Sequence, residues 1–140
     1  MSFLLDTNVV SETRHRRPDA QVIRWLTAQR DESLHLSVLV VGELRIGALS
    51  LARRDPAAGA ALGAWIDEVE ARFADRIAPV DRVVARRWAE LNVPDRMPAV
   101  DGLLAATASV HGWTLVTRNV ADMAASGVET LNPFEAPRST

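Results

Sequence analysis

The chain has no cysteine, no lysine and no apolar run long enough to cross a lipid bilayer. Without cysteine, neither disulfide bonds nor thiol chemistry are available. A membrane-spanning helix needs roughly 20 consecutive apolar residues, and no segment approaches that length. The N-terminus also lacks the basic segment and small-residue cleavage site of a secretory signal peptide. These absences predict a cytoplasmic protein without a membrane segment.

Several common catalytic arrangements are also missing. The sequence contains no glycine-rich pattern for binding a nucleotide phosphate or a dinucleotide. Its three histidines, His15, His35 and His111, lack metal-ligand spacing, and none has an obvious nucleophile partner. Ser/His catalysis is therefore not supported.

All 16 basic residues are arginine, and the net charge is −2. A GC-rich coding sequence is the simpler reason for the arginine bias, although the planar guanidinium also suits phosphate well. The negative total argues weakly against a general nucleic-acid binder. It does not exclude a nuclease, because an acidic metal site lowers the total charge and bound cations restore it locally.

The 140 residues, 48% of them hydrophobic, predict one domain with its own core over residues 1–135, followed by a loose tail over 136–140. Apolar patterning predicts strands over residues 3–5, 34–36, 76–80, 114–117 and 128–131. It predicts helices over residues 9–12, 20–29, 38–51, 57–73, 82–91 and 100–110. Strands that alternate with helices indicate a parallel sheet covered on both faces.

Acidic residues stand at unusual places in this pattern. Asp6 ends the first apolar strand, and Glu43 and Asp101 each lie within apolar runs. Asn119 follows another apolar strand. Carboxylates are costly to bury unless they are paired or bound to a cation, so several of them in apolar surroundings suggest a shared site for a hard metal ion.

Each of these acids could instead have an ordinary structural role. Asp6 could be a turn residue or a helix cap, Glu43 a solvated helix residue, and Asp101 an acid that favours the helix dipole. All three roles would have to hold together for the metal site to be absent.

Five segments follow one another in order along almost the whole chain. They are LLDTNVVSE from Leu4, the stretch from Ser37 to Gly47, DGLLAATA from Asp101, TRN from Thr117 and NPF from Asn132. Together they resemble the PIN-domain ribonucleases, particularly the VapC toxins of bacterial toxin–antitoxin pairs and their FitB-like branch. The resemblance implies an α/β fold, a PIN-like three-layer α/β/α sandwich with a central, mostly parallel sheet.

The resemblance implies a catalytic set of Asp6, Glu43, Asp101 and the position of Asn119, to which the sequence adds Asp122 as a candidate. Mg²⁺ or Mn²⁺ usually takes one or two direct carboxylates, so we expect Asp6 and Asp101 to be the main ligands. Glu43 would be a further ligand or would orient the attacking water. Many relatives carry an acid where this chain has Asn119, and Asp122 three residues later could supply that charge or could cap the segment that follows. The sequence is therefore compatible with one metal ion or two.

Polar neighbours form a candidate supporting set. Thr7, Asn8 and Thr117 could hydrogen-bond the acids or an attacking water, or could simply be polar residues at strand ends. Arg118 could contact an RNA phosphate, pair with a site acid or be solvated. A basic loop with Arg14, Arg16 and Arg17 could grip an RNA backbone, or could be a solvated charge cluster.

The residues alone suggest an acidic metal site. The resemblance implies that the protein is a metal-dependent endoribonuclease that acts on RNA as the toxin of a toxin–antitoxin pair. The resemblance supplies the partner, a VapB/FitA-like antitoxin over the metal site along the helix of Val41 and Leu44. We also expect a homodimer, because apolar side chains exceed what one small sheet can cover: Leu39, Leu49, Leu62, Trp65 and Ile66. Two alternatives stay open, a metal-dependent phosphatase and a catalytically weakened PIN domain that binds RNA or a partner.

Overall fold

The computed structural model describes residues 1–135 and contains one sheet of five short parallel strands. The strands are β1 (Phe3–Leu5), β2 (Leu34–Ser37), β3 (Ile77–Ala78), β4 (Thr114–Val116) and β5 (Thr130–Leu131). They lie side by side in the order β3-β2-β1-β4-β5, and all four pairings are parallel. The expected parallel sheet is confirmed, with β3 and β5 shorter than the sequence indicated. The tail expected over 136–140 lies outside the described residues.

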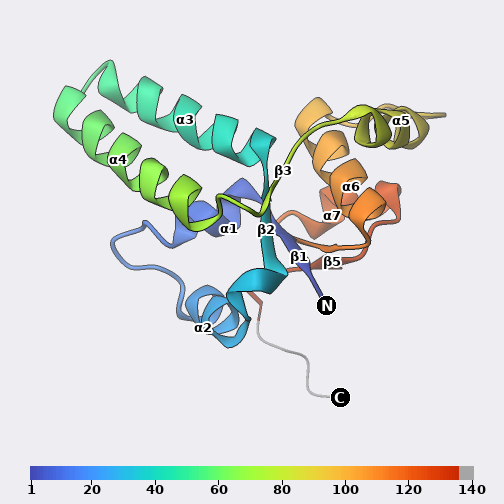
Figure 1. Cartoon of the computed structure of the whole chain (residues 1–140), viewed down its shortest axis with the longest axis horizontal. Helices are drawn as coiled ribbons and strands as arrows, with labels where there is room; N and C mark the ends of the chain where they lie inside the picture. Colours follow the sequence, from blue (N-terminus) through green and yellow to red (C-terminus); the bar gives the residue numbers. More distant parts are fainter. Residues whose placement is uncertain (136–140) are drawn as a thin grey trace.

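Helices cover both faces of the sheet (Figure 1). One side carries α1 (Thr7–Glu12), α2 (Ala20–Ala28), α3 (Val38–Ala52) and α4 (Pro56–Arg72). The other side carries α5 (Arg82–Leu91), α6 (Ala99–His111) and α7 (Val120–Met123). Short 3₁₀ turns, η1 (Asp31–Ser33) and η2 (Ala124–Ser126), complete the chain. The connections change side between β1 and β4, and such a switch point is where open parallel sheets bind ligands.

Local capping chemistry sets where several helices begin. Asp19, Ser37, Asp55 and Asp81 each accept a hydrogen bond from a backbone N–H in the first turn of the following helix. These bonds satisfy donors that a helix cannot satisfy itself. At the other end of α6, Gly112 adopts a left-handed conformation with φ of 70°, which closes the helix as the sequence indicated.

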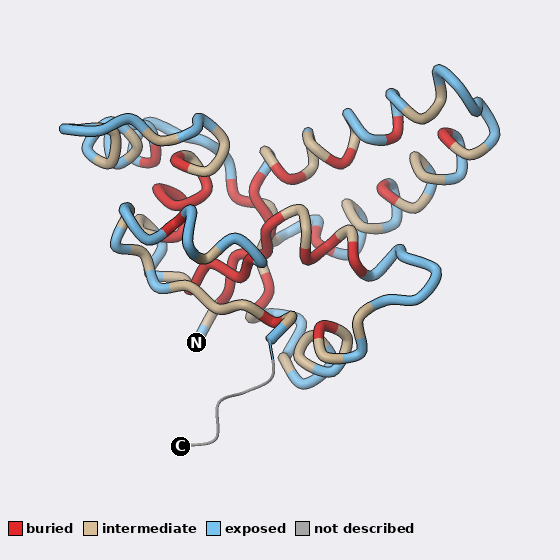
Figure 2. Tube along the Cα trace, turned by 180° about the vertical axis from the view of Figure 1, so that it is seen from behind, coloured by how far each residue is buried: buried red, intermediate tan, exposed pale blue. Residues whose placement is uncertain are grey.

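The core is centred on the two middle strands. Leu4 and Leu115 are fully buried there, and the most buried stretches of the trace converge on β1, β4 and α6 (Figure 2). Of the residues expected to drive dimer formation, only Leu49 is strongly exposed, together with Ile46 on the same helix. Ile66 is fully buried, so that part of the expectation was wrong. No helix within residues 1–135 is long and apolar enough to span a membrane.

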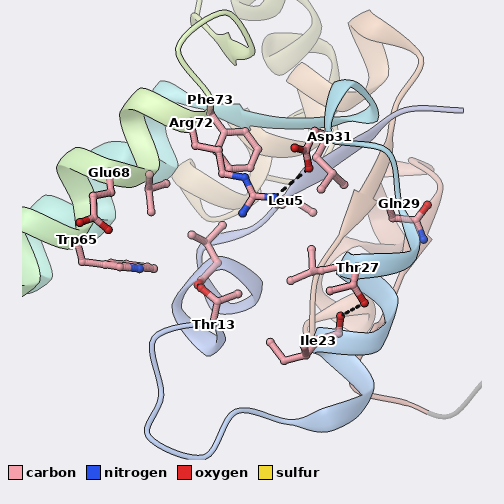
Figure 3. Close-up of a pocket in the computed structure, with 14 residues that line it drawn as sticks. Leu5, Thr13, Ile23, Thr27, Gln29, Asp31, Trp65, Glu68, Arg72 and Phe73 are labelled. Carbon is pink, nitrogen blue, oxygen red and sulfur yellow. Dashed lines mark hydrogen bonds and ion pairs between the residues drawn. The ribbon is translucent and has the colours of Figure 1, made fainter.

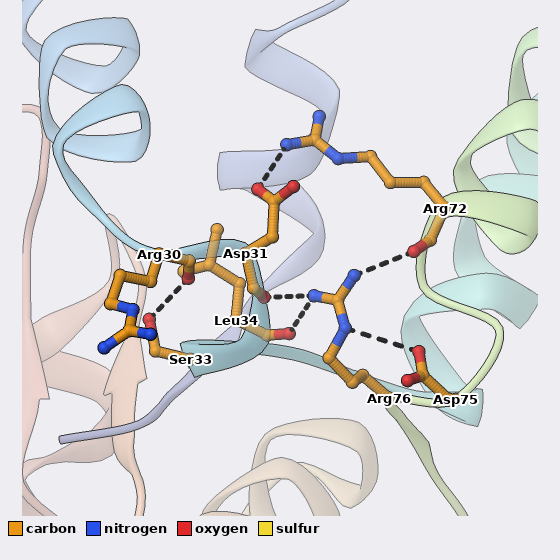
Figure 4. A network of polar contacts seen from close by, with 7 residues as sticks. All are labelled: Arg30, Asp31, Ser33, Leu34, Arg72, Asp75 and Arg76. Carbon is orange, nitrogen blue, oxygen red and sulfur yellow. Dashed lines mark hydrogen bonds and ion pairs between the residues drawn. The ribbon is translucent and has the colours of Figure 1, made fainter.

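Arg76 ties the end of α4 to the start of β2. Its guanidinium donates to the backbone carbonyls of Asp31, Leu34 and Arg72, and it pairs with Asp75 (Figure 4). Three carbonyls from separate segments thus share one cation. This contact fixes η1, and with it the end of α2, relative to α4.

The α3–α4 hairpin depends on a close approach between two helices. A Cβ atom at Gly59 of α4 would lie 2.4 Å from Cβ of Ala52 and 2.5 Å from its Cα. Farther along α4, a Cβ atom at Gly63 would meet nothing within 4 Å. The two glycines on one helix therefore differ in whether the fold needs them.

We expect Gly59→Ala to destabilise the protein by roughly 1–3 kcal/mol, because the helices must separate. Gly63→Ala is the matched control and should be neutral or stabilising by up to about 1 kcal/mol, since alanine favours helix. Urea unfolding of both variants measures the difference. Equal stability of the two would show that the helices do not need the close approach.

Candidate acidic active site

The site lies at the carboxyl ends of β1 and β4, where the chain connections change side. Asp6 follows β1, and Thr117 follows the neighbouring β4. Only 6% of Asp6 is exposed. Its carboxylate nevertheless accepts hydrogen bonds from three groups. The hydroxyl of Thr117 donates to its Oδ2 at 2.8 Å, the backbone N–H of Thr7 donates to its Oδ1 at 2.7 Å, and Asn8 donates to Oδ2 at 3.3 Å.

Asp6 is at once a helix cap and a site acid. It occupies the cap position of α1 and accepts the N–H of Thr7 there. The capping role and the site role that the sequence suggested are therefore not exclusive. The capping hydrogen bond fixes the orientation of the Asp6 carboxylate. The second oxygen, Oδ2, then accepts the hydrogen bond from Thr117.

Glu43 reaches the same place from α3. The hydroxyl of Thr7 donates to its Oε1 at 2.6 Å. Thr7 consequently connects the acid on α3 to the first turn of α1. Asp101 arrives from the opposite side of the sheet, in the first turn of α6, as the sequence indicated.

The carboxylates repel one another. Burial raises the pKa of Asp6 above its usual range, and the nearby charge of Glu43 adds to this despite the three donors. The pKa of Asp101 is also raised, first by burial and then by Asp6, Asp122 and Glu43. Four acids from four segments thus share one electrostatic environment, although they are far apart in sequence.

Asn119 and Asp122, the two candidates for the fourth polar position, interact differently with the site. The backbone N–H of Asn119 donates to the Thr117 hydroxyl at 3.0 Å, whereas its side chain makes no hydrogen bond within residues 1–135. Asp122 lies in α7 without the hydrogen bond that a capping role would require, and its charge acts on Asp101. The charge of Asp122 thus reaches Asp101 at this corner, whereas the Asn119 side chain brings none.

Residues 3–122 match the family model described as the PIN domain. The chain belongs to the PIN domain family. It is 34% identical over 96% of its length to the plasmid stability protein StbB of Pseudomonas syringae, covering 99% of that protein. It is 35% identical over 95% of its length to the VapC ribonuclease Y4jK of Sinorhizobium fredii, covering 98% of it.

Solved structures agree with the family assignment. The crystal structure of FitAcB from Neisseria gonorrhoeae matches with a TM-score of 0.89 and 33% identity, covering 96% of this chain and 99% of that one. The three-layer architecture expected from the sequence is therefore confirmed.

The atoms that this site could offer to a metal ion are those that a hard cation binds. They are carboxylate and hydroxyl oxygens, without sulfur or imidazole. Among residues 1–135, however, no three acidic or histidine side chains converge into a ready-made metal group. This arrangement fits an ion such as Mg²⁺, which keeps several waters and takes only one or two carboxylates directly.

Sequence reasoning gave no role to Glu12, a buried acid at the end of α1. Its Oε2 accepts the N–H of Asp19 at 2.8 Å, and its Oε1 lies 3.1 Å from Nδ1 of His15. It thereby closes the basic loop between α1 and α2. An acid at the end of an apolar helix, ahead of a basic loop, was the available signal.

We expect Asp101→Asn to raise the unfolding temperature without divalent cations at neutral pH. The folded protein holds the Asp101 proton more tightly than the unfolded chain, whose pKa is 3.8, so stability falls as the pH rises through the interval between the two values. Asparagine does not ionise, so the variant avoids this loss of stability. The gain in unfolding temperature should vanish below pH 3.8, where Asp101 is protonated in both the folded and the unfolded state.

Thermal unfolding followed across pH measures this effect. Asp95→Asn in the exposed loop before α6 is the matched control, and it should leave the unfolding temperature unchanged. An Asp101→Asn variant no more stable than the wild type at pH 7 would contradict the proposed repulsion.

Proposed function

We propose that this PIN domain is a metal-dependent endoribonuclease and the toxin of a toxin–antitoxin pair. The observation that carries the proposal is electrostatic: at the switch point of a parallel sheet, Glu43 raises the pKa of buried Asp6, and Asp6, Asp122 and Glu43 raise the pKa of Asp101. A bound cation would stabilise the charged forms of these acids. The relatives include a protein named a VapC ribonuclease and one named toxin FitB.

Asp6 and Asp101 would hold Mg²⁺ or Mn²⁺, and Glu43 would hold it through water or orient the attacking water. The bound ion would lower the pKa of water and offset the charge of the scissile phosphate. Thr117 keeps Asp6 turned toward the site by donating to it. Thr7 does the same for Glu43, so both supporting threonines act on an acid.

A groove on the other side of α1 suits the antitoxin (Figure 3). It measures about 560 Å³ and lies between α1, α2 and α4, with Val10, Ile23, Leu26, Trp65 and Phe73 among its lining residues. The helix of Val41 and Leu44 is less suitable than the sequence suggested, because Leu44 is buried in the core. We propose that an apolar antitoxin segment occupies this groove and sends an arginine toward the acids.

The exposed apolar face of α3 suits a second copy of the chain. Ile46 is 65% exposed and Leu49 is 70% exposed, three residues apart on one helix face. Symmetric dimers are the commonest assembly of soluble proteins. We propose that this face forms the homodimer contact.

Induced expression with mapping of cellular RNA ends tests the nuclease. Wild-type protein is expected to produce new RNA ends, whereas Asp6→Asn should produce none, because the change removes a charge that holds the cation. Asp95→Asn carries the same chemical change away from the site and should cleave like the wild type. Hydrolysis of small phosphomonoesters without RNA cleavage would favour a phosphatase, and binding without any cleavage would favour a weakened PIN domain.

Metal titration by calorimetry tests the corner near α7. We expect Asp122→Asn to weaken Mg²⁺ affinity roughly ten-fold, at the low end of what supporting groups contribute. Asn119→Ala should change it little, because the Asn119 side chain makes no hydrogen bond in the part of the chain that the structure describes. The reverse order would show that the Asn119 carbonyl oxygen reaches the metal.

A further inference from the structure

Arg118 is fixed to the acidic site through its backbone. It directly follows Thr117, the donor to Asp6, and its own N–H donates to Oδ1 of Asn8 at 3.1 Å. Asn8 in turn donates to both Asp6 and Thr117. Arg118 therefore belongs to the same hydrogen-bonded unit as the buried acid, and the start of its side chain cannot move independently of the site.

The Arg118 side chain is held in place without using its hydrogen-bond donors. The guanidinium carbon lies 3.7 Å from the centre of the Phe134 ring. Nη2 lies 3.9 Å from Oε1 of Glu12, which is too long for a hydrogen bond. Glu12 already accepts the N–H of Asp19 and pairs with His15. Within residues 1–135 the Arg118 side chain donates no hydrogen bond, and 55% of it is exposed.

A stacked guanidinium of this kind suits a phosphate. Stacking on an aromatic face orients the planar group and leaves its edge free, and that edge matches two phosphate oxygens. The position is also favourable electrostatically, because Arg118 follows the donor to Asp6 and the carboxylates of that site repel a polyanion. A cation on a rigid support beside the acids would hold the RNA backbone against that repulsion.

We propose that Arg118 binds an RNA backbone phosphate next to the cleavage position, with Phe134 and Glu12 as its positioning residues. This inference rests on the proposed ribonuclease function and adds a substrate contact to it. The ligand is single-stranded RNA backbone without base preference, since a guanidinium edge on phosphate reads no sequence.

Binding of a fluorescent single-stranded RNA of mixed sequence, without divalent cations and across a range of salt concentrations, tests the proposal. Arg118→Ala should weaken binding about ten-fold and lower the salt slope by about 0.7, the value for one phosphate contact on a single strand. Arg118→Lys should keep the slope but recover only part of the affinity, because lysine lacks the planar fork. With Mg²⁺, Arg118→Ala should raise KM more than it lowers kcat.

Two further variants separate this role from general effects. Arg54 is exposed in the turn between α3 and α4, and that turn lies far from the strand ends that carry the site (Figure 1). Arg54→Ala removes the same charge there and should bind RNA like the wild type. Phe134→Leu keeps every charge and some packing, and it should raise KM because Arg118 loses its support. Unfolding temperatures show whether each variant remains folded.

Several outcomes would overturn the proposal. If Arg118→Ala and Arg118→Lys bind RNA with wild-type affinity and salt slope while the wild type cleaves RNA, only the role of Arg118 is wrong. The same holds if Arg54→Ala weakens binding equally, or if Arg118→Ala weakens only the antitoxin complex. A wild-type protein that neither binds nor cleaves RNA would overturn the ribonuclease function itself, and this proposal with it.

Discussion

The structure depends on keeping one carboxylate, Asp6, buried between two parallel strands. A buried charge is tolerated only where donors surround it, and the donors to Asp6 come from the first turn of α1 and the end of β4. Thr7 and Asn8 require that α1 start directly after β1, and Thr117 requires that β4 pair with β1 in the observed register. The local turn, the central strand pairing and the site thus satisfy one electrostatic requirement.

The same site works against the stability of the fold. The raised pKa values of Asp6 and Asp101 show that burial and mutual repulsion disfavour their charged forms. The surrounding core offsets this with fully buried side chains such as Leu4, Leu104 and Leu115. A fold that keeps acids in an unfavourable arrangement trades stability for a site, a pattern common at functional positions.

The six residues of α1 separate two surfaces of different chemistry. Its first turn, with Thr7 and Asn8, holds the acids, while Val10 lines the apolar groove on the other side. Glu12 at its end pairs with His15 of the basic loop, and its Oε1 lies 3.9 Å from Nη2 of Arg118. Under the proposed function, substrate and antitoxin would meet the protein on opposite sides of one short helix, so occupancy of the groove and geometry of the acids would be linked mechanically.

The sequence by itself determined the local features: Asp6 at the end of a strand, the caps at Ser37 and Asp81, and the parallel alternation of strands and helices. These follow from short-range rules, because a cap or a strand end involves residues only a few positions apart. Tertiary structure alone decided that the charge of Asp122 acts on Asp101, that Ile66 is buried, and that Arg118 lies over the ring of Phe134. Those outcomes depend on how elements distant in sequence pack together, and neither spacing nor composition encodes such contacts.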